Sequence, residues 1–290
     1  MIESYFIHIL ILIGIYLIFA LSLQLVLGFT GILNFGHIAF FAIGAYVSAL
    51  LMLNGLPFMV AILLAGIISA ICGFLFSIPI NKLKGDYVAL ATLSFSFVIY
   101  AVALNWTSLT RGALGLHNIP KPEIFGFSFS SNISFLILTV LICIISYFVI
   151  NRVVSSPFGK ALEAVRDNEL AARVIGKSAF KLKSVALVVS AFFAGIAGSL
   201  FAHYITYIDP SSFTIIQLTP ILCIVIIGGL ASLRGTLIAT VILVLLPESL
   251  RFIGFSSQIV GPMRQIVYSL LLLLILIYKP KGLYGRIKLD

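Results

Sequence analysis

The sequence predicts an all-α polytopic integral membrane protein, a helical bundle of about nine transmembrane helices within a range of eight to ten. Hydrophobic residues make up 61% of the 290 residues and charged residues only 9%, whereas about 25% of the residues in a soluble domain are charged. The mean hydropathy is +1.22, and no Asp, Glu, Lys or Arg lies between Glu3 and Lys82. Residues 1–290 are therefore expected to form a single transmembrane domain without a separate soluble domain.

The uncharged amino-terminal stretch is long enough for three crossings. It would measure ~117 Å as a helix, and one crossing needs about 30 Å. Gly and Pro residues divide it at 28–36 and 54–57, which places spans at 5–27, 37–54 and 57–80. The first divider has two interpretations: irregular backbone that lines a path within the membrane, or a tight cytoplasmic turn.

Six further apolar runs complete the predicted bundle. These spans lie at about 87–105, 133–150, 184–205, 217–230, 236–250 and 262–278. An odd number of crossings places the two ends of the chain on opposite sides of the membrane.

The Lys and Arg residues divide unequally between the two sides that these spans create. One side receives 14 of the 18, namely Lys82, Lys84, Arg152, Lys160, Arg166, Arg173, Lys177, Lys181, Lys183, Arg234, Lys279, Lys281, Arg286 and Lys288. The other side receives Arg111, Lys121, Arg251 and Arg264. Because cytoplasmic loops hold the excess of basic residues, we expect an outside N-terminus and a cytoplasmic C-terminus. The net charge of +9 then reflects membrane topology, and no nucleic-acid partner is expected.

Two loops are too long and too patterned for simple connections. The outer loop, 106–132, is rich in turn-forming residues and is expected to be an ordered extracytoplasmic cap, with a passive linker as the alternative. The inner loop, 151–183, is the most polar stretch, and we expect an amphipathic helix between Ser156 and Gly176.

The predicted inner helix has an apolar face and a face of mixed charge. The apolar face carries Phe158, Leu162, Val165 and Ala172, and the opposite face carries Lys160, Glu163 and Asp167. Lipid-surface helices concentrate Lys and Arg on the polar face, so the mixed charges favour docking to a protein. A solvated connector is the alternative.

The residues give no sign of catalysis, a cofactor or a metal site. Cys72, Cys143 and Cys223 lie in apolar runs without metal-ligand spacing. No acidic residue lies near the middle of a predicted span, and ion or proton relays need such residues. We therefore expect a transport path whose energy comes from other proteins, with no cofactor and no metal.

Several motifs resemble a known family of membrane permeases. In chain order they are Gly28-Phe-Thr-Gly31, Asn34-Phe-Gly-His-Ile-Ala-Phe40, Ile43-Gly-Ala-Tyr46, Asp86-Tyr-Val-Ala-Leu-Ala-Thr92, Leu109-Thr-Arg-Gly-Ala-Leu-Gly115, Ser156-Pro-Phe-Gly-Lys-Ala-Leu-Glu-Ala-Val-Arg-Asp-Asn-Glu-Leu-Ala-Ala172, Ala194-Gly-Ile-Ala-Gly198, Gly228-Gly229 and Pro280-Lys-Gly-Leu-Tyr-Gly285. Together they resemble the LivM-type permeases of branched-chain amino acid ABC importers.

The resemblance implies a permease of a bacterial inner membrane that carries leucine, isoleucine and valine. Its implied partners are a second homologous permease, two cytoplasmic ATP-binding subunits, an extracytoplasmic solute-binding protein and the lipid bilayer. It also implies that the loop 151–183 couples the permease to an ATPase, through Lys160, Glu163, Ala164, Arg166, Asp167, Ala171, Ala172 and Gly176.

Two further groups of residues are assigned to the transport path and to the outer loop. We expect the path at Gly28, Gly31, Asn34, Gly36, His37, Thr92, Gly228 and Gly229. In the outer loop we select Thr110, Arg111, Gly112 and Gly115.

The chain departs from the family pattern at two positions. Lys160 stands where an arginine is expected, and Arg111 stands where a small or polar residue is common. Arg111 leaves the solute open between branched-chain amino acids and the alternatives of urea, short amides or other amino acids. A self-contained secondary carrier and a membrane scaffold without transport remain the alternatives in other classes.

Overall fold

The computed structural model describes the chain except for residues 1, 84, 125, 253–256, 280 and 286–290. The helices are α1 (Ile2–Thr30), α2 (His37–Leu53), α3 (Phe58–Ile80), α4 (Asp86–Asn105), α5 (Thr107–Thr110), α6 (Asn132–Ser155), α7 (Pro157–Asp167), α8 (Glu169–Val174), α9 (Ala179–Ile205), α10 (Ile215–Gly228), α11 (Leu233–Phe252) and α12 (Ser257–Tyr278). The other elements are two 3-10 helices, η1 (Gly112–Leu114) and η2 (Pro210–Phe213), and four short strands, β1 (Leu116–His117), β2 (Glu123–Ile124), β3 (Phe127–Ser128) and β4 (Tyr207–Ile208). Of the residues selected from the sequence, Lys84, Pro280, Arg286 and Lys288 lie outside the described residues.

The helices confirm an all-α polytopic membrane protein. Each predicted span coincides with one long helix to within five residues at either end. Within the described ranges, six helical segments are long and apolar enough to cross a membrane, namely α1, α3, α4, α6, α9 and the η2–α10 segment. Three shorter apolar helical segments lie in α2, α11 and α12.

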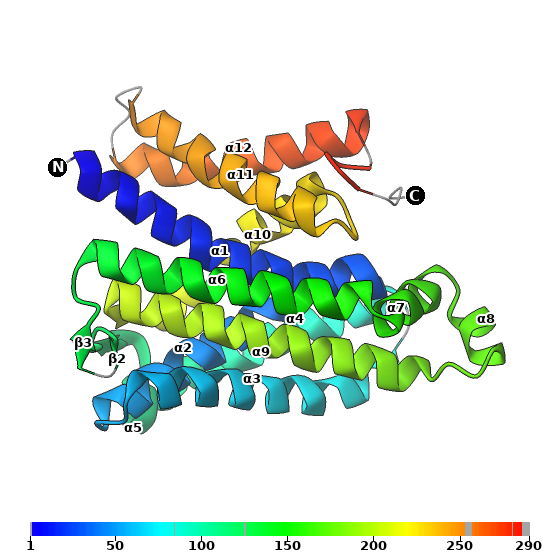
Figure 1. The fold of residues 1–290 in the computed structure, drawn as a ribbon, viewed down its shortest axis with the longest axis horizontal. Helices are drawn as coiled ribbons and strands as arrows, with labels where there is room; N and C mark the ends of the chain where they lie inside the picture. Colours follow the sequence, from blue (N-terminus) through cyan, green and yellow to red (C-terminus); the bar gives the residue numbers. More distant parts are fainter. Residues whose placement is uncertain (1, 84, 125, 253–256, 280, 286–290) are drawn as a thin grey trace.

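Helices α1 and α9 form the centre of the bundle. Helix α1 contacts α6, α9, α10 and α11, while α9 also packs against α2 and α3. Small residues permit this packing: a Cβ on Gly44 of α2 would overlap the backbone of Gly195 in α9. The long helices lie roughly side by side, and α1 begins at the end of the bundle opposite to that where α12 finishes (Figure 1).

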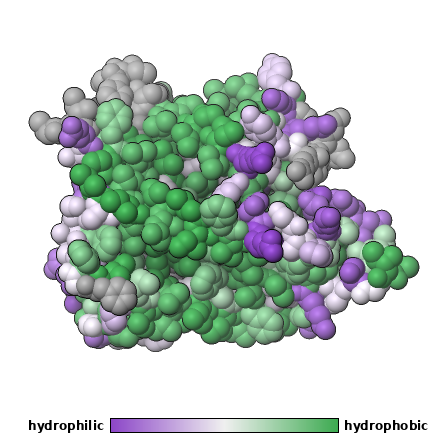
Figure 2. All heavy atoms as spheres, viewed as in Figure 1, coloured by the Kyte–Doolittle hydropathy of each residue, from purple (hydrophilic) through white to green (hydrophobic). Residues whose placement is uncertain are grey.

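The surface has the distribution that a bilayer requires. Large apolar side chains are exposed along α3, α4 and α6, for example Leu75, Leu90 and Phe148. In Figure 2 hydrophobic residues cover the middle of the visible face, and hydrophilic residues gather mainly at the end that carries α7 and α8. This pattern matches helices surrounded by lipid with polar loops at their ends.

The connection from α1 to α2 turns back into the bundle. Helix α1 continues to Thr30, residues 31–36 are non-helical, and α2 begins at His37. The His37 ring contacts Ser22, with 2.8 Å between Nε2 and Oγ. Ser22 lies eight residues before the last residue of α1, which is about 12 Å along the helix. The tight-turn interpretation of 28–36 is therefore wrong.

The inner loop contains two short helices, which corrects the single helix predicted between Ser156 and Gly176. Asn168 separates α7 from α8 with extended dihedrals (φ −155°, ψ 100°), and its side chain accepts a hydrogen bond from the Ala171 backbone N–H at 3.0 Å. Asn prefers such capping positions to helix interiors because its side chain competes for backbone hydrogen bonds. Gly176 does end the helical region, with a φ of +79°.

The outer loop is ordered, as the sequence analysis expected of a cap. Strand β1 pairs with β4, where Leu116 faces Ile208, and β2 pairs with β3. The His203 ring on α9 adds a hydrogen bond of 2.8 Å between its Nδ1 and the carbonyl oxygen of Pro120. These contacts fix the loop to the end of α9 and close the bundle opposite to α7 and α8 (Figure 1).

Candidate functional site

Four separated motifs meet at the α7 end of the bundle. The Arg166 guanidinium of α7 donates from Nη1 to the Gly28 carbonyl oxygen of α1 at 2.9 Å. Gln24, one turn earlier on α1, donates from Nε2 to the Gly229 carbonyl oxygen at 2.8 Å. The carboxy-terminal backbone joins through Tyr284, whose N–H donates to the Gly228 carbonyl oxygen at 3.1 Å. We call this group, formed by Gln24, Gly28, Arg166, Gly228, Gly229 and 281–285, the inner junction.

The glycines of the inner junction permit close backbone approach. A Cβ on Gly28 would lie 2.7 Å from the Ala231 backbone nitrogen, and one on Gly228 would lie 2.7 Å from the Gly235 carbonyl. Gly229 has a φ of +100°, which L side chains rarely adopt, and its α-carbon faces Gly285. Gly28, Gly228 and Gly229, which the sequence analysis assigned to the transport path, are brought together here, where they are buried and permit close helix packing.

The remaining predicted path residues surround the start of α2. Thr92 of α4 holds the returning segment, because its Oγ1 accepts a hydrogen bond from the Phe35 N–H at 3.1 Å. A Cβ on Gly36 would lie 2.5 Å from the Thr92 carbonyl oxygen. Gly31 is exposed with a φ of +71° and packs against the Arg166 side chain. The segment 31–36 is therefore fixed between α4 and α7.

Three buried side chains near this segment have polar atoms without a partner among the described residues. They are Asn34 at both amide atoms, His37 at Nδ1 and Gln24 at Oε1. Each side chain is fully buried. A buried donor or acceptor left unsatisfied costs about 1–3 kcal/mol, and a bound water molecule, ion or ligand is one way to remove that cost.

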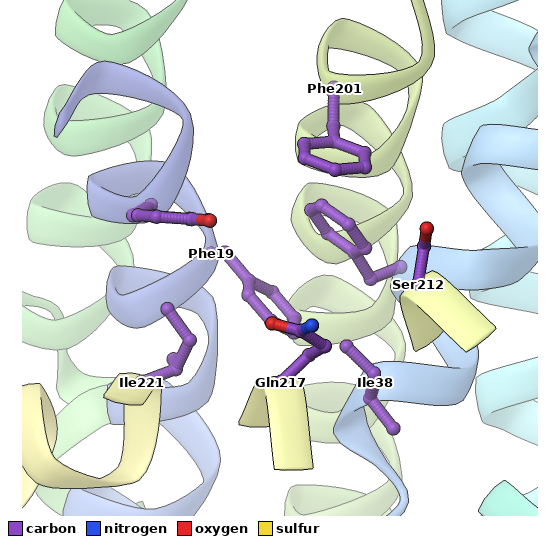
Figure 3. A pocket seen from close by; sticks show the side chains of 8 residues that line it. Phe19, Ile38, Phe201, Ser212, Gln217 and Ile221 are labelled. Atoms are coloured by element: carbon purple, nitrogen blue, oxygen red, sulfur yellow. The ribbon is translucent and has the colours of Figure 1, made fainter. Parts of the chain in front are cut away.

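A cavity of about 200 Å³ lies beside the first turns of α2, where Ile38 and Phe41 line it. Its lining comes from α1, α2, α9, η2 and α10, and consists of Tyr16, Phe19, Ile38, Phe41, Phe201, Ser212, Gln217 and Ile221. Figure 3 shows the labelled side chains around a common space, with the Gln217 amide near its middle. Sequence reasoning missed this group, because buried aromatic residues are indistinguishable from core residues. The signal available was Gln217, an amide within an apolar run.

The inner loop presents only part of the predicted coupling set. Of the predicted apolar face, Leu162, Val165 and Ala172 are buried and Phe158 is half-buried. Of the selected residues, Lys160, Ala164, Asp167, Ala171 and Gly176 are exposed, and Glu163 is half-buried. Ala172 and Arg166 face inward, and the Arg166 side chain is only 14% exposed.

Helix α8 exposes an apolar surface that the sequence analysis did not select. Leu170, Val174 and Ile175 are 74%, 87% and 68% exposed. Figure 2 shows hydrophobic residues at the tip where Figure 1 places α8, surrounded by hydrophilic ones. Exposed apolar groups of this kind are typical of surfaces that contact another protein or a membrane. We call Leu170, Val174 and Ile175 the α8 apolar tip.

Ion pairs hold α8 in place. Glu169 pairs with Arg173 of the same helix, and the Lys183 Nζ of α9 lies 2.6 Å from its Oε2. The hydrogen bond and charge of Lys183, followed by those of Arg173, lower the pKa of the Glu169 carboxyl despite partial burial. The pair with Lys183 fixes the orientation of α8 relative to α9.

The selected outer-loop residues shape a turn after α4. Thr110 is buried, and its Oγ1 lies 2.7 Å from the Ala103 carbonyl oxygen. Arg111, Gly112 and Gly115 all have positive φ values, of 61°, 59° and 66°. The Arg111 guanidinium is directed at His117, with 2.9 Å between Nη1 and Nε2. Arg111 is exposed and directly follows α5, which lies at the opposite end of the bundle from α7 (Figure 1).

In the part of the chain that the structure describes, no three His, Cys, Asp or Glu side chains are placed as metal ligands.

Comparisons with known proteins show the family to which the chain is similar. Residues 5–276 match the family described as branched-chain amino acid transport system / permease component. The chain is 37% identical to the high-affinity branched-chain amino acid transport system permease protein LivM of Salmonella typhimurium, over 93% of this chain and 67% of that protein. It is 27% identical to the probable LivM of Methanocaldococcus jannaschii, over 93% of this chain and 90% of that protein.

A second type of permease is also similar. The chain is 24% identical to LivH of Escherichia coli, over 93% of this chain and 91% of that protein. No solved structure matches. The matched residues include the segment 31–36, the inner loop and the inner junction except for 281–285. The chain belongs to the branched-chain amino acid transport system permease family.

Proposed function

We propose that the protein is a permease subunit of an ABC importer that carries leucine, isoleucine and valine across a bacterial inner membrane. The observation that carries this proposal is the inner junction, where Arg166 of the inner loop contacts the backbone of α1 beside the returning segment. The family supplies the solute class, because its members LivM and LivH are named for branched-chain amino acid transport. ATP hydrolysis belongs to partner subunits in this proposal.

We further propose nine crossings with the N-terminus outside and the C-terminus in the cytoplasm. The short helices α2 and α10 are 17 and 14 residues long. In this proposal the segment 31–36 completes the crossing that α2 is too short to make alone, and η2 lengthens the crossing of α10. The described basic residues of the inner loop lie at the α7 end, which supports a cytoplasmic position for this end.

The inner loop is proposed as the coupling element between the permease and an ATP-binding subunit. The α8 apolar tip and the exposed coupling residues form the docking surface, and α7 carries the movement inward. Arg166 then links α7 to Gly28 and Gly31, so that a shift of α7 moves the returning segment. Such rigid-body movement opens the path alternately to the two sides.

The remaining proposed partners are a second homologous permease, a second ATP-binding subunit and an extracytoplasmic solute-binding protein. The similarity to both LivM and LivH supports pairing of two permeases. The outer loop, with Arg111 at its surface, is the proposed contact region for the solute-binding protein.

The experiment that tests the function is uptake by the complete importer. The chain is produced with the products of its neighbouring genes, and co-purification of two ATP-binding subunits is measured first. Uptake of the solute captured by the binding protein is then measured with excess leucine, isoleucine, valine, urea and acetamide. We expect competition by the three branched-chain amino acids. Competition by urea or acetamide alone would contradict the solute, and uptake without any ATP-binding subunit would favour a secondary carrier.

A further inference from the structure

Helix α2 begins inside the bundle beside polar atoms that the described residues leave unsatisfied. Its N-cap is Gly36, and no described side chain caps it. Asn34 and His37 are 0% exposed, and neither amide atom of Asn34 has a hydrogen-bond partner in the described structure. Asn34 is directed at the helix start, because its Oδ1 lies 3.3 Å from the position that a Cβ on Gly36 would take.

The hydrogen-bond arrangement at His37 defines which of its atoms is free. The Ser22 hydroxyl donates to the Phe19 carbonyl oxygen at 2.7 Å. With this hydroxyl direction its oxygen accepts from His37 Nε2–H across the 2.8 Å contact. In the corresponding tautomer His37 Nδ1 is an unprotonated acceptor, and no described residue satisfies it.

These groups offer complementary sites for two opposite charges. The first N–H groups of a helix and its dipole favour a carboxylate, and Asn34 Nδ2 is a further donor. Asn34 Oδ1 and His37 Nδ1 are acceptors, which suit an ammonium group. An α-amino acid carries one carboxylate and one ammonium group on its main chain.

The neighbouring cavity suits an aliphatic side chain. Ile38, in the first turn of α2, lines the cavity of about 200 Å³. Phe19 lies between the two places, because it lines the cavity and stacks on the His37 ring with 5.1 Å between centroids, so its side chain must move for one solute to reach both. Figure 3 shows Phe19, Ile38, Phe201 and Ile221 around the space.

We propose that the first turn of α2, with Asn34 and His37, binds the charged main chain of an α-amino acid in transit, while the aliphatic side chain enters the cavity lined by Phe19 and Ile38. The proposal rests on the proposed function, since it places the solute within the importer. The competing occupant of the Asn34 site is a buried water molecule, which the test must distinguish.

The first test measures protection of position 34 by the solute. Asn34→Cys is made on a background without Cys72, Cys143 and Cys223, and the complete importer is reconstituted in vesicles. Labelling of the introduced thiol by a small methanethiosulfonate is expected to slow several-fold with L-leucine. Leucinamide, which lacks the carboxylate, and 4-methylpentanoate, which lacks the ammonium group, are expected to protect less.

The matched control is Ser69→Cys on the same background. Ser69 is also fully buried, but its hydroxyl is satisfied by the Phe40 carbonyl oxygen at 3.1 Å. Leucine is expected to leave the labelling of this variant unchanged. Equal effects of leucine on Asn34→Cys and Ser69→Cys, or no labelling of Asn34→Cys in any condition, would overturn the site and favour a water molecule.

A second variant keeps the proposal testable if Asn34→Cys does not assemble. Asn34→Asp has nearly the same shape but places a negative charge beside the expected carboxylate. We expect a loss of at least tenfold in leucine transported per ATP hydrolysed, about 1.4 kcal/mol, and a smaller loss for Asn34→Ser. An unchanged ratio in Asn34→Asp would overturn the site.

Uptake by the wild-type importer separates this proposal from the proposed function. Leucine uptake by the wild type, without protection of the thiol in Asn34→Cys, contradicts the site alone. If wild-type uptake excludes leucine, isoleucine and valine, the proposed function fails by itself, and the labelling is measured with the amino acids that are taken up. If none of these amino acids protects the thiol of Asn34→Cys, the site is overturned as well.

Discussion

Arg166 differs from the other charged residues of the inner loop because its side chain is directed into the bundle. The sequence analysis grouped it with exposed coupling residues, but it is 14% exposed and donates to the Gly28 carbonyl oxygen. It also pairs with its neighbour Asp167 at 2.8 Å, which offsets part of the cost of burying the charge. Arg166 thus acts through α1, and a role in direct docking is better assigned to exposed residues.

Replacing Arg166 is expected to separate docking from transport. Arg166→Gln removes a charge-assisted hydrogen bond worth about 1.5–3 kcal/mol, so we expect lower thermal stability and loss of solute-stimulated ATP hydrolysis while ATP-binding subunits still co-purify. Arg166→Lys should show a smaller defect, because Lys keeps the charge without the planar guanidinium. Lys177→Gln, an exposed change in the same loop outside the selected coupling residues, is the control. Equal behaviour of Arg166→Gln and Lys177→Gln would contradict the link to Gly28.

Glu169 gives the inner loop a dependence on pH. The pKa of its carboxyl is lowered in the folded protein by Lys183 and then by Arg173. The ion pairs therefore stabilise α8 fully at pH values above the ordinary pKa of Glu, and this stabilisation is lost as the pH falls through the lowered pKa. We expect amide exchange in residues 169–177 to accelerate as the pH falls below about 4.3, after correction for intrinsic rates. Glu169→Gln should exchange fast at all pH values. A wild-type profile that matches Glu169→Gln would refute the role of these pairs.

At the scale of elements, the sequence predicted the long helices and missed the local interruptions. The apolar runs and the Gly and Pro dividers placed all the spans close to observed helices. Asn168 was read as a residue within a helix, although its cap on α8 is a typical Asn position. The cavity at Gln217 could not be predicted, because its lining joins five elements that meet only through tertiary packing.

The α8 apolar tip is expected to dominate docking. Leu170, Val174 and Ile175 expose apolar surface, and burying each large aliphatic side chain contributes about 1.5–3 kcal/mol. Replacing the three by Ser should therefore abolish co-purification of the ATP-binding subunits while the permease stays inserted. Lys177→Ser, an exposed change just after α8, is the matched control. Retention of the subunits by the triple variant would show that the charged face of α7 is the docking surface.

At the scale of the whole molecule, function depends on which end faces the cytoplasm. The inner junction and α8 lie at one end, and the outer loop with β1–β4 lies at the other (Figure 1). Only one orientation places the α8 apolar tip within reach of cytoplasmic ATP-binding subunits and the outer loop within reach of a solute-binding protein. The basic-residue distribution and the proposed coupling therefore require the same orientation by independent arguments.

This orientation predicts opposite labelling of two exposed serines. Ser178 precedes α9 at the α7 end, whereas Ser130 precedes α6 at the opposite end. On a background without Cys72, Cys143 and Cys223, an impermeant thiol reagent applied to intact cells should label Ser130→Cys and leave Ser178→Cys unlabelled. Permeabilised cells are the control, and there both should react. Labelling of both variants from outside would contradict an odd number of crossings between residue 130 and residue 178. Labelling of Ser178→Cys alone would show that the bundle has the opposite orientation, which excludes docking of cytoplasmic ATP-binding subunits at α8.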